Sequence, residues 1–546
     1  MLALISIAIS LVGLPFVEGS DTVQLGGATL VGRPLPLLHQ TFFGGIPYAK
    51  PPVGALRFKP PVLLESLPHG TFDATNFGTS CLQADLPISE SSEDCLTINV
   101  FRPSGIDEHS KLPVFAWIYG GAYVTGTANL YNGSEIVAQS IARGTPLVYV
   151  NFNYRVGALG FPQGHEAAAN GAFNLGLKDQ LTALEWIQRH ISTFGGDKDK
   201  VTVAGQSAGA ESVSLHFMTD AIAGLARAGI MQSGAQATSA VLAGTREDDW
   251  QNFVSAIAPC ASLATSGSTF DCLRSSANTT EIFQGVVTAA AKTTHIFPWS
   301  ITLDGPHGVI PELPAALLKK GKFSKLPFIT GNVLDEGTSF VQPTIDSVDG
   351  LIGELQEISF PPTPSETALD DAINNLLALY PDDPALGSPY NTGNETFGLS
   401  PEYKRAAAVI GDTNFLSQVS FWRRTATSAG VKTFGYFFTQ PQPLSPPEIG
   451  VAHSSDLNYV YGTVPANDTS PAAFQLSKII IDYWVSFATS LDPNDKHGNP
   501  RPHWTQYTPH SEMLMQLHGE NITMIPDDFH KDQVSFINSD PTPWRH

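Results

Sequence analysis

Apolar runs alternate with an amphipathic segment between residues 112 and 204. The segments L-P-V-F-A-W-I-Y (112–119), P-L-V-Y-V-N-F (146–152) and K-V-T-V-A (200–204) each read as a continuous apolar strand. Between the last two, residues 178–192 place leucine and isoleucine side chains three or four residues apart, which predicts a helix with one buried face. Apolar strands joined by such helices indicate an α/β protein with a mostly parallel central sheet and helices on both faces.

Ser207 lies between two glycines directly after the third of these strands, in A-G-Q-S-A-G-A (204–210). Glycines around a serine are also typical of a plain tight turn, so the motif by itself fits either interpretation. Val213 and Phe217 follow at helical spacing. A strand, a sharp turn and a helix are the setting of a nucleophile elbow, which exposes the serine hydroxyl and leaves the N–H of Ala208 free for an oxyanion. This context favours Ser207 as a nucleophile.

A nucleophilic serine needs a general base, and the base needs an acid that orients it. On this fold the chain order is serine, acid, histidine. Asp335 and Glu336 follow the strand-like segment 326–330, and the residues alone do not choose between them. His453 follows the strand-like segment 431–440 and is the base we expect. The other late histidines lie in polar or C-terminal surroundings: His497, His503, His510, His518, His530 and His546.

Seven segments spread over nearly all of the chain resemble the type-B carboxylesterase/lipase family, which has the α/β-hydrolase fold and includes secreted fungal lipases and esterases. The segments are G-I-P-Y-A-K-P-P-V-G-A-L-R-F (45–58), S-E-D-C-L-T-I-N-V (92–100), W-I-Y-G-G-A-Y-V-T-G (117–126), N-Y-R-V-G-A-L-G-F (153–161), F-G-G-D-K-D-K-V-T-V-A-G-Q-S-A-G (194–209), L-D-E-G-T-S-F (334–340) and H-S-S-D-L-N-Y-V-Y-G (453–462). The resemblance implies a carboxylic ester hydrolase that forms an acyl-serine. It also implies that Glu336 is the acid, because in the family pattern the carboxylate directly precedes glycine.

The same resemblance implies an oxyanion hole. Its backbone donors are the N–H groups of Gly121, Ala122 and Ala208, which stabilise the charge of a tetrahedral intermediate. Gly120 and Gly121 could instead form a plain turn, but they follow an apolar strand that ends in W-I-Y. The resemblance further implies an ion pair between Arg57 and Glu93, and a hydrogen bond from Ser233 to the catalytic residues.

Three features predict export from the cell. Residues 1–19 form an apolar run of secretory length, which predicts a signal peptide followed by a single domain over 20–546. The four cysteines form two local pairs, Cys81 with Cys95 and Cys260 with Cys272, which is the pairing that closes the shortest loops. Candidate N-glycosylation sites occur at Asn132, Asn278, Asn394, Asn467 and Asn521.

The net charge of −21 argues against nucleic acid or an anionic membrane surface as a partner. We find no second apolar stretch of spanning length and expect no integral membrane anchor. The expected chemistry needs no metal or organic cofactor, and there is no C-x-x-C motif. The expected partner is a small-molecule or lipid ester, and the sequence is compatible with self-association.

The loop between Cys81 and Cys95 bears on the substrate. It holds thirteen residues and no tryptophan, whereas lipases of the family carry a long amphipathic lid here and cholinesterases a cation-binding aromatic residue. We therefore expect an open site with weak interfacial activation, and hydrophobic or aromatic esters rather than choline esters. Two rivals are a catalytically inactive binding module, which typically lacks one of the three catalytic residues, and a peptidase or amidase.

Overall fold

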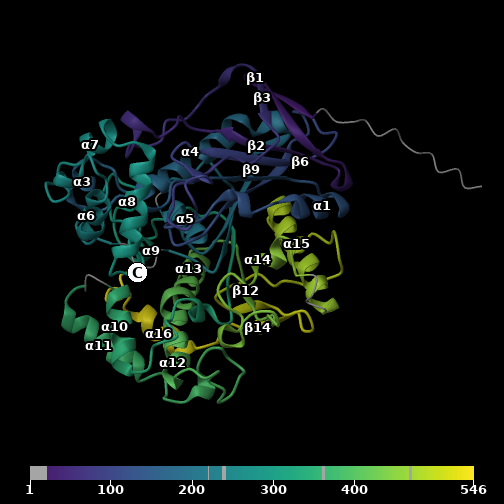
Figure 1. Ribbon diagram of the computed structural model, residues 1–546. Helices are drawn as coiled ribbons and strands as arrows, with labels where there is room; N and C mark the ends of the chain where they lie inside the picture. Colours follow the sequence, from purple (N-terminus) through teal and green to yellow (C-terminus); the bar gives the residue numbers. More distant parts are fainter. Residues whose placement is uncertain (1–20, 219, 237–240, 360–362, 466–469) are drawn as a thin grey trace, which may run out of the picture.

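A twelve-stranded sheet runs through the computed structural model, which describes residues 21–218, 220–236, 241–359, 363–465 and 470–546 (Figure 1). The strand order is β14-β13-β12-β11-β10-β9-β7-β8-β6-β2-β1-β3. The strands are β1 (Thr22–Leu35), β2 (Gln40–Pro47), β3 (Leu67–Ala74), β6 (Thr97–Pro103), β7 (Leu112–Ile118), β8 (Val148–Phe152), β9 (Gly196–Gln206), β10 (Ala228–Gln232), β11 (Phe328–Val333), β12 (Thr433–Phe438), β13 (Met513–Leu517) and β14 (Thr523–Pro526).

The centre of the sheet is parallel. All neighbouring pairs from β8 across to β13 are parallel, whereas β14 and the run from β6 to β1 add antiparallel pairs at the two sides. Every residue of β8, β10, β11 and β12 is buried, which explains why these strands read as unbroken apolar runs. The predicted mostly parallel sheet is confirmed.

Helices cover both faces of the sheet (Figure 1). On one side α1 (Ser134–Ala142) packs against α15 (Pro471–Ser490), and both contact central strands. On the other side lie α4 (Leu175–His190), α5 (Ala208–Met218) and α13 (Ser417–Ser428). The helix expected over 178–192 is α4, which begins three residues earlier and passes into a 3-10 turn at Ile191.

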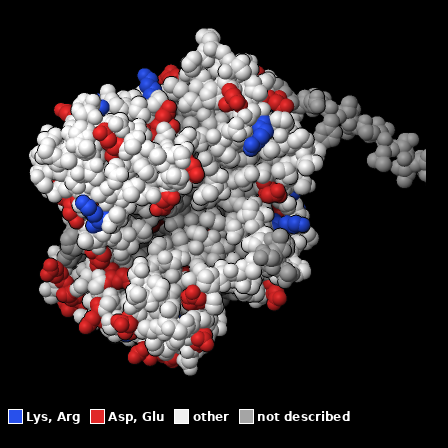
Figure 2. All heavy atoms as spheres, viewed as in Figure 1, with Lys and Arg blue, Asp and Glu red and all other residues white. Residues whose placement is uncertain are grey.

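Two groups of helices lie beyond the sheet, to the left in Figure 1. The first consists of α6 (Glu247–Ser255), α7 (Phe270–Ser275) and α8 (Thr279–Lys292). The second consists of α10 (Val348–Ile358), α11 (Glu366–Leu377), α12 (Pro401–Gly411) and α16 (Lys531–Ser539), which share a hydrophobic cluster separate from the main core. Acidic side chains predominate over the second group in Figure 2, in agreement with the net charge.

The cysteines form two disulfides, Cys81–Cys95 and Cys260–Cys272. The segment closed by the first contains turns and the two-residue strands β4 (Ser80–Cys81) and β5 (Ser91–Ser92), and no helix. Four of the five candidate glycosylation sites are exposed: Asn132, Asn278, Asn394 and Asn521. The fifth, Asn467, and the predicted signal peptide lie outside the described residues. Among the helices of the described part of the chain, none has the length and apolar character needed to cross a bilayer.

Candidate active site

Ser207 stands alone between the end of β9 and the start of α5. Its φ of 56° is left-handed, a conformation that costs a non-glycine residue free energy and persists only where the surroundings enforce it. The Ser207 N–H donates to the carbonyl of Gln232 on β10, and the Ser207 carbonyl accepts from the N–H of Glu211 in α5. The chain thus turns sharply from strand to helix at this serine, as the elbow motif predicts.

The glycines around Ser207 are required by close backbone contacts. A Cβ atom on Gly209 would lie 2.1 Å from the carbonyl oxygen of Ile118 on β7, and one on Gly205 would lie 2.5 Å from the backbone of Gly209. A Cβ atom on Gly120 would lie 2.8 Å from the Cβ of Ser207. The backbone segments around Ser207 therefore lie too close together to admit a side chain between them. These segments are helix α5, the ends of β7 and β9, and the loop after β7.

Glu336 and His453 contact each other directly. Oε2 of Glu336 lies 2.6 Å from Nδ1 of His453, and both side chains are nearly buried. The other oxygen, Oε1, accepts from the N–H of Val333 at 2.9 Å and from the amide of Asn332 at 3.2 Å. These donors at the end of β11 hold the carboxylate in place, so that it can accept the Nδ1–H of the imidazole.

Asp335 is the carboxylate that residue order alone could not exclude. Its side chain accepts hydrogen bonds from the hydroxyl of Ser388 and the N–H groups of Tyr390 and Val451, each at 2.8 Å. Burial raises the pKa of Asp335, and these hydrogen bonds oppose the rise. The carboxylate of Asp335 is therefore bound by the segments at Ser388–Tyr390 and Val451, whereas the carboxylate of Glu336 faces the histidine.

The second nitrogen of His453 contacts the elbow. The amide nitrogen of Gln206, the residue before Ser207, lies 3.1 Å from Nε2 of His453 and 2.8 Å from Oγ of Ser454. When Nδ1 donates to Glu336, Nε2 carries the lone pair that can accept a proton. The rings of Phe340 and Phe415 pack on the imidazole, with centroids 5.1 and 4.7 Å from its own.

A pocket opens over Ser207. It has an empty volume of about 830 Å³, part of it open to solvent, and Phe340 and Phe415, which pack on His453, also line it. The other lining residues are Ala122, Tyr123, Ser207, Ala208, Glu211, Arg246, Ile296, Phe297, Trp299, Ser300, Glu357, Ile358 and Asn414. Ser207 thus lines a largely aromatic and aliphatic space in which an apolar acyl or alcohol group can be buried.

The loop after β7 borders this pocket beside Ser207. Gly121, Ala122 and Tyr123 have φ values of 110°, 53° and 63°. In the described part of the chain, neither Gly121 nor Ala122 donates its N–H to a backbone or side-chain acceptor. Ala208 is the first residue of α5, where helix geometry leaves the N–H without an intrahelical partner. Ala122 and Ala208 line the pocket together with Ser207, and Gly121 directly precedes Ala122.

A buried carboxylate, Asp456, lies behind the histidine. Burial raises its pKa to about 6, against hydrogen bonds from Gln232 and Tyr436, and the carboxylate of Glu336 adds to the rise while His453 opposes it. The Gln232 amide and the Tyr436 hydroxyl donate to Asp456 at 2.8 and 2.9 Å. The electrostatic environment of His453 therefore includes two carboxylates, of which only Glu336 touches the ring.

Sequence reasoning missed several of these contacts. The sequence marks Gln206 only by its position next to Ser207, and it marks Asn332 only by its position four residues before Glu336. Phe415 belongs to a π-helical turn, Asp412–Leu416, which no periodicity predicts. Ser233 is fully buried, but its hydroxyl has no hydrogen-bond partner among the described residues, so the expected hydrogen bond to the catalytic residues is wrong.

The expected ion pair between Arg57 and Glu93 is confirmed. Nε of Arg57 lies 2.6 Å from the Glu93 carboxylate, and a second nitrogen, Nη2, lies 2.8 Å from its other oxygen. Glu93 precedes Cys95 of the first disulfide by two residues. The pair therefore anchors the base of the disulfide loop.

The sheet and its strand-to-helix elbow define an α/β-hydrolase. A family model described as the carboxylesterase family matches residues 20–537. The chain belongs to this family, and it is a carboxylic ester hydrolase of the lipase and esterase group.

Relatives match over almost their whole length. The chain is 32% identical to "Secreted lipase 1" of Botryotinia fuckeliana, over 94% of this chain and 92% of that protein. It is also 32% identical to "Lipase 2" of Geotrichum candidum, over 91% of this chain and 92% of that protein. The crystal structure of EstA of Aspergillus niger superposes with a TM-score of 0.83 at 26% identity, over 97% of this chain and 99% of that one.

Proposed function

We propose that the enzyme hydrolyses hydrophobic or aromatic esters through an acyl-serine, with Ser207 as nucleophile, His453 as base and Glu336 as the acid that orients it. The observation that carries the proposal is the 2.6 Å contact between Glu336 and Nδ1 of His453, because it directs Nε2 toward the turn that carries Ser207. No other carboxylate of the described residues contacts this imidazole.

In the proposed reaction Ser207 Oγ attacks the ester carbonyl carbon while Nε2 of His453 takes the hydroxyl proton. The imidazolium, stabilised by Glu336, then gives this proton to the departing alcohol oxygen. In the second half, water attacks the acyl-serine while His453 removes its proton. The imidazolium then returns this proton to Ser207 Oγ as the acyl–oxygen bond breaks and the carboxylic acid leaves. The Gln206 amide now bonded to Nε2 has to give way to the serine hydroxyl, and Ser454 Oγ remains as its partner.

We propose the N–H groups of Gly121, Ala122 and Ala208 as the oxyanion hole. Supporting this assignment, Ala122 and Ala208 border the pocket next to Ser207, and the backbone at Gly120 lies against the Ser207 side chain. Donors aimed at the developing negative charge stabilise the transition state more than the ground state, by about 3 kcal/mol for each donor.

The pocket supports an apolar substrate. Tyr123, Phe297, Trp299, Phe340 and Phe415 bring aromatic rings to its wall. The names of the relatives, which are lipases, agree with an ester that has a hydrophobic acyl chain. The short, helix-free disulfide loop supports a site that no long lid covers.

We propose that the enzyme acts outside the cell as one catalytic domain over residues 20–546, after removal of residues 1–19. Two disulfides and four exposed sequons support export, since both are typical of secreted proteins. Several of the relatives carry the word secreted in their names.

A panel of p-nitrophenyl esters of increasing acyl length, with a feruloyl ester beside it, tests the substrate class. We expect kcat/KM to rise from acetate to medium chains, because each buried CH₂ contributes about 0.8 kcal/mol until the pocket is filled. Trp299→Ala should flatten this rise. The proposed apolar pocket would be contradicted if kcat/KM fell from acetate onward and Trp299→Ala gave the same profile as the parent.

A further inference from the structure

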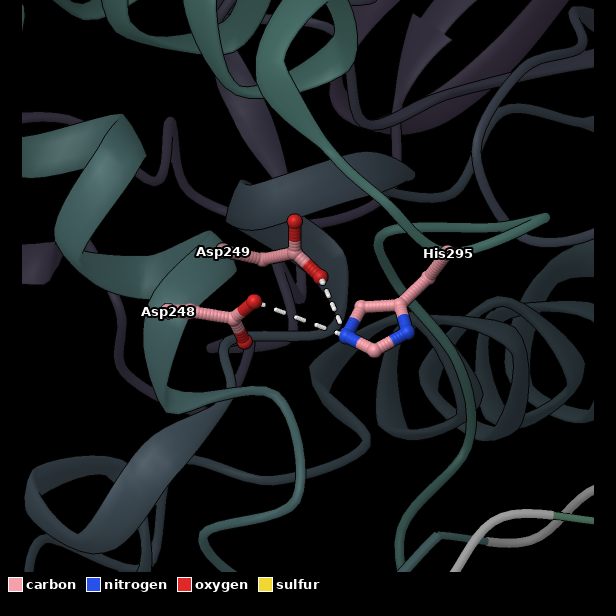
Figure 3. Close-up of side chains that lie close together, drawn as sticks. All are labelled: Asp248, Asp249 and His295. Atoms are coloured by element: carbon pink, nitrogen blue, oxygen red, sulfur yellow. Dashed lines mark ion pairs between the residues drawn. The ribbon is translucent and has the colours of Figure 1, made fainter. Parts of the chain in front are cut away.

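Three side chains from two distant segments meet beside the active-site pocket. Asp248 and Asp249 stand in the first turn of α6, and their carboxylates point toward the imidazole of His295, which lies in the segment after α8 (Figure 3). One potential ligand atom from each residue lies within 4.8 Å of the others. The proposed hydrolysis uses none of these residues.

Asp249 is the unusual member of this group. Its side chain is 0% exposed, and its carboxylate interacts with the Thr293 side chain, but neither carboxylate oxygen has a hydrogen bond of ordinary geometry among the described residues. Burying a carboxylate without well-formed hydrogen bonds is unfavourable, so such groups in proteins are usually paired with a cationic side chain or bind a cation. One carboxylate oxygen of Asp249 is directed at Nε2 of His295, and one oxygen of Asp248 is directed at the same nitrogen, which makes the space beside this nitrogen the place for a cation (Figure 3).

His295 presents its second nitrogen to the same space. Nδ1 lies 2.7 Å from the carboxylate of Glu357, at the end of α10, which fixes the ring and places its lone pair on Nε2 when Nδ1 donates. Nε2 lies 3.6 Å from Asp248 and 3.8 Å from Asp249. Both separations are too long for hydrogen bonds. A carboxylate on the far nitrogen of a histidine is the usual arrangement around a metal-bound imidazole.

We propose that Asp248, Asp249 and His295 bind one divalent cation of the zinc class. Two ligands held about 2.1 Å from an ion at a tetrahedral angle lie about 3.4 Å apart, so Nε2 of His295 has to approach each carboxylate by only a few tenths of an ångström, and the two carboxylates lie within 4.8 Å of each other. Asp248 is 56% exposed at its side chain, which leaves an entry path and room for a water as fourth ligand.

Charge and ligand type agree with this class. Arg246 lies 3.3 Å from Glu357, so that pair is close to neutral, and the two aspartates leave a charge that one divalent cation balances. An imidazole with two carboxylates suits Zn²⁺ or a similar transition metal, whereas Ca²⁺ and Mg²⁺ prefer all-oxygen sites.

The ion would stabilise a wall of the substrate pocket. His295 directly precedes Ile296 and Phe297, which line the pocket over Ser207, and Glu357 lines it from α10. Asp248 and Asp249 belong to α6, so a cation that they share with His295 would join α6 to this segment of the pocket wall. The proposed cation is therefore structural: it joins α6 to the pocket segment and touches none of the groups that react.

The proposal is tested by titrating the metal-free full-length enzyme with ZnCl₂ in a calorimeter. The bound metal is then counted by mass spectrometry. We expect one Zn²⁺ per chain, and a rise in Tm of about 2 °C at a hundredfold excess over Kd. Asp249→Asn and His295→Gln should each lower the affinity at least tenfold. CaCl₂ and MgCl₂ should bind at least tenfold more weakly than zinc.

His109→Gln is the matched control, because Nε2 of His109 also lies 3.6 Å from a carboxylate, that of Glu108, but on the open surface. It should leave zinc binding unchanged. Without zinc, Asp249→Asn should be at least as stable as the parent, since it removes the charge of a fully buried carboxylate. This measurement reports on the site even when His295→Gln fails to fold. Absence of one-equivalent binding up to about 100 μM Zn²⁺, or full binding by Asp249→Asn, overturns the proposal. The cluster would then consist only of the contacts of His295 with the two aspartates.

Discussion

Oε2 of Glu336 lies 2.6 Å from Nδ1 of His453, although the two residues are 117 positions apart in the chain. The carboxylate next to it, Asp335, makes three hydrogen bonds to other loops. Adjacent acids at the end of one strand thus have separate tasks, and this separation can be tested.

Glu336→Gln should lower kcat by about 10⁴ with little change in Tm, because an amide cannot hold the imidazole in the required tautomer or stabilise its positive charge. Asp335→Asn is the matched control. It should lower the unfolding free energy by about 1–3 kcal/mol, since an amide cannot accept all three hydrogen bonds, and should retain most of kcat. Steady-state kinetics and thermal melts of both variants check this. Equal losses of kcat in the two variants would contradict the assignment of the acid.

Gly209→Ala should disrupt the elbow, because the new Cβ would lie 2.1 Å from a backbone oxygen of β7. We expect a loss of about 2 kcal/mol or more in stability together with a large loss of kcat. Gly353→Ala in α10 is the control, since a Cβ there meets no atom within 4 Å. It should be stabilising by about 0.5–1 kcal/mol. Unchanged activity in Gly209→Ala would show that the elbow tolerates displacement.

Acid should destabilise the fold partly through His216, whose pKa burial lowers to about 3. Below pH 6.5 the unfolded chain binds a proton that the folded His216 refuses, so stability falls as the pH drops, by up to about 1.4 kcal/mol per pH unit. Urea unfolding between pH 7 and pH 4.5 should therefore show a shallower decline for His216→Gln than for the parent. The exposed His109 provides the control, and parallel curves for His216→Gln and the parent would refute the contribution.

Interfacial activation should be weak, because the segment between Cys81 and Cys95 has no helix that could act as a lid. The rate of hydrolysis of a short-chain triglyceride should rise smoothly through its solubility limit. A sharp increase at that limit would instead require a lid elsewhere in the molecule. Light scattering on the same samples marks the limit independently.

The sequence predicted the strands and the elbow well, because buried parallel strands and glycine-flanked turns leave strong local signals. Apolar runs correctly placed β7, β8 and β9, and chain order placed His453 after β12. The pattern could not choose between Asp335 and Glu336, since both are carboxylates at the same strand end. Their roles depend on Ser388, Tyr390 and Val451, which are remote in the chain.

The pocket wall was beyond the reach of local patterns. Phe340, Phe415, Trp299 and Tyr123 come from four separate segments of the chain, and no local pattern distinguishes an aromatic residue of a pocket wall from one of the core. The contact between Asp249 and His295 could not be predicted from local patterns either. Two acids at the start of a helix read as favourable helix-dipole charges, and only tertiary structure shows that one of them, Asp249, is fully buried and faces His295.

Covalent labelling with a fluorophosphonate, read by intact mass and peptide mapping, tests the central claim most directly. The account predicts one adduct per chain, on Ser207, and none on a folded Ser207→Ala variant. Ser233→Ala, which removes a buried hydroxyl without hydrogen-bond partners, should label like the parent. An adduct that persists in Ser207→Ala, or a folded, ester-hydrolysing parent that stays unlabelled, would contradict Ser207 as the nucleophile.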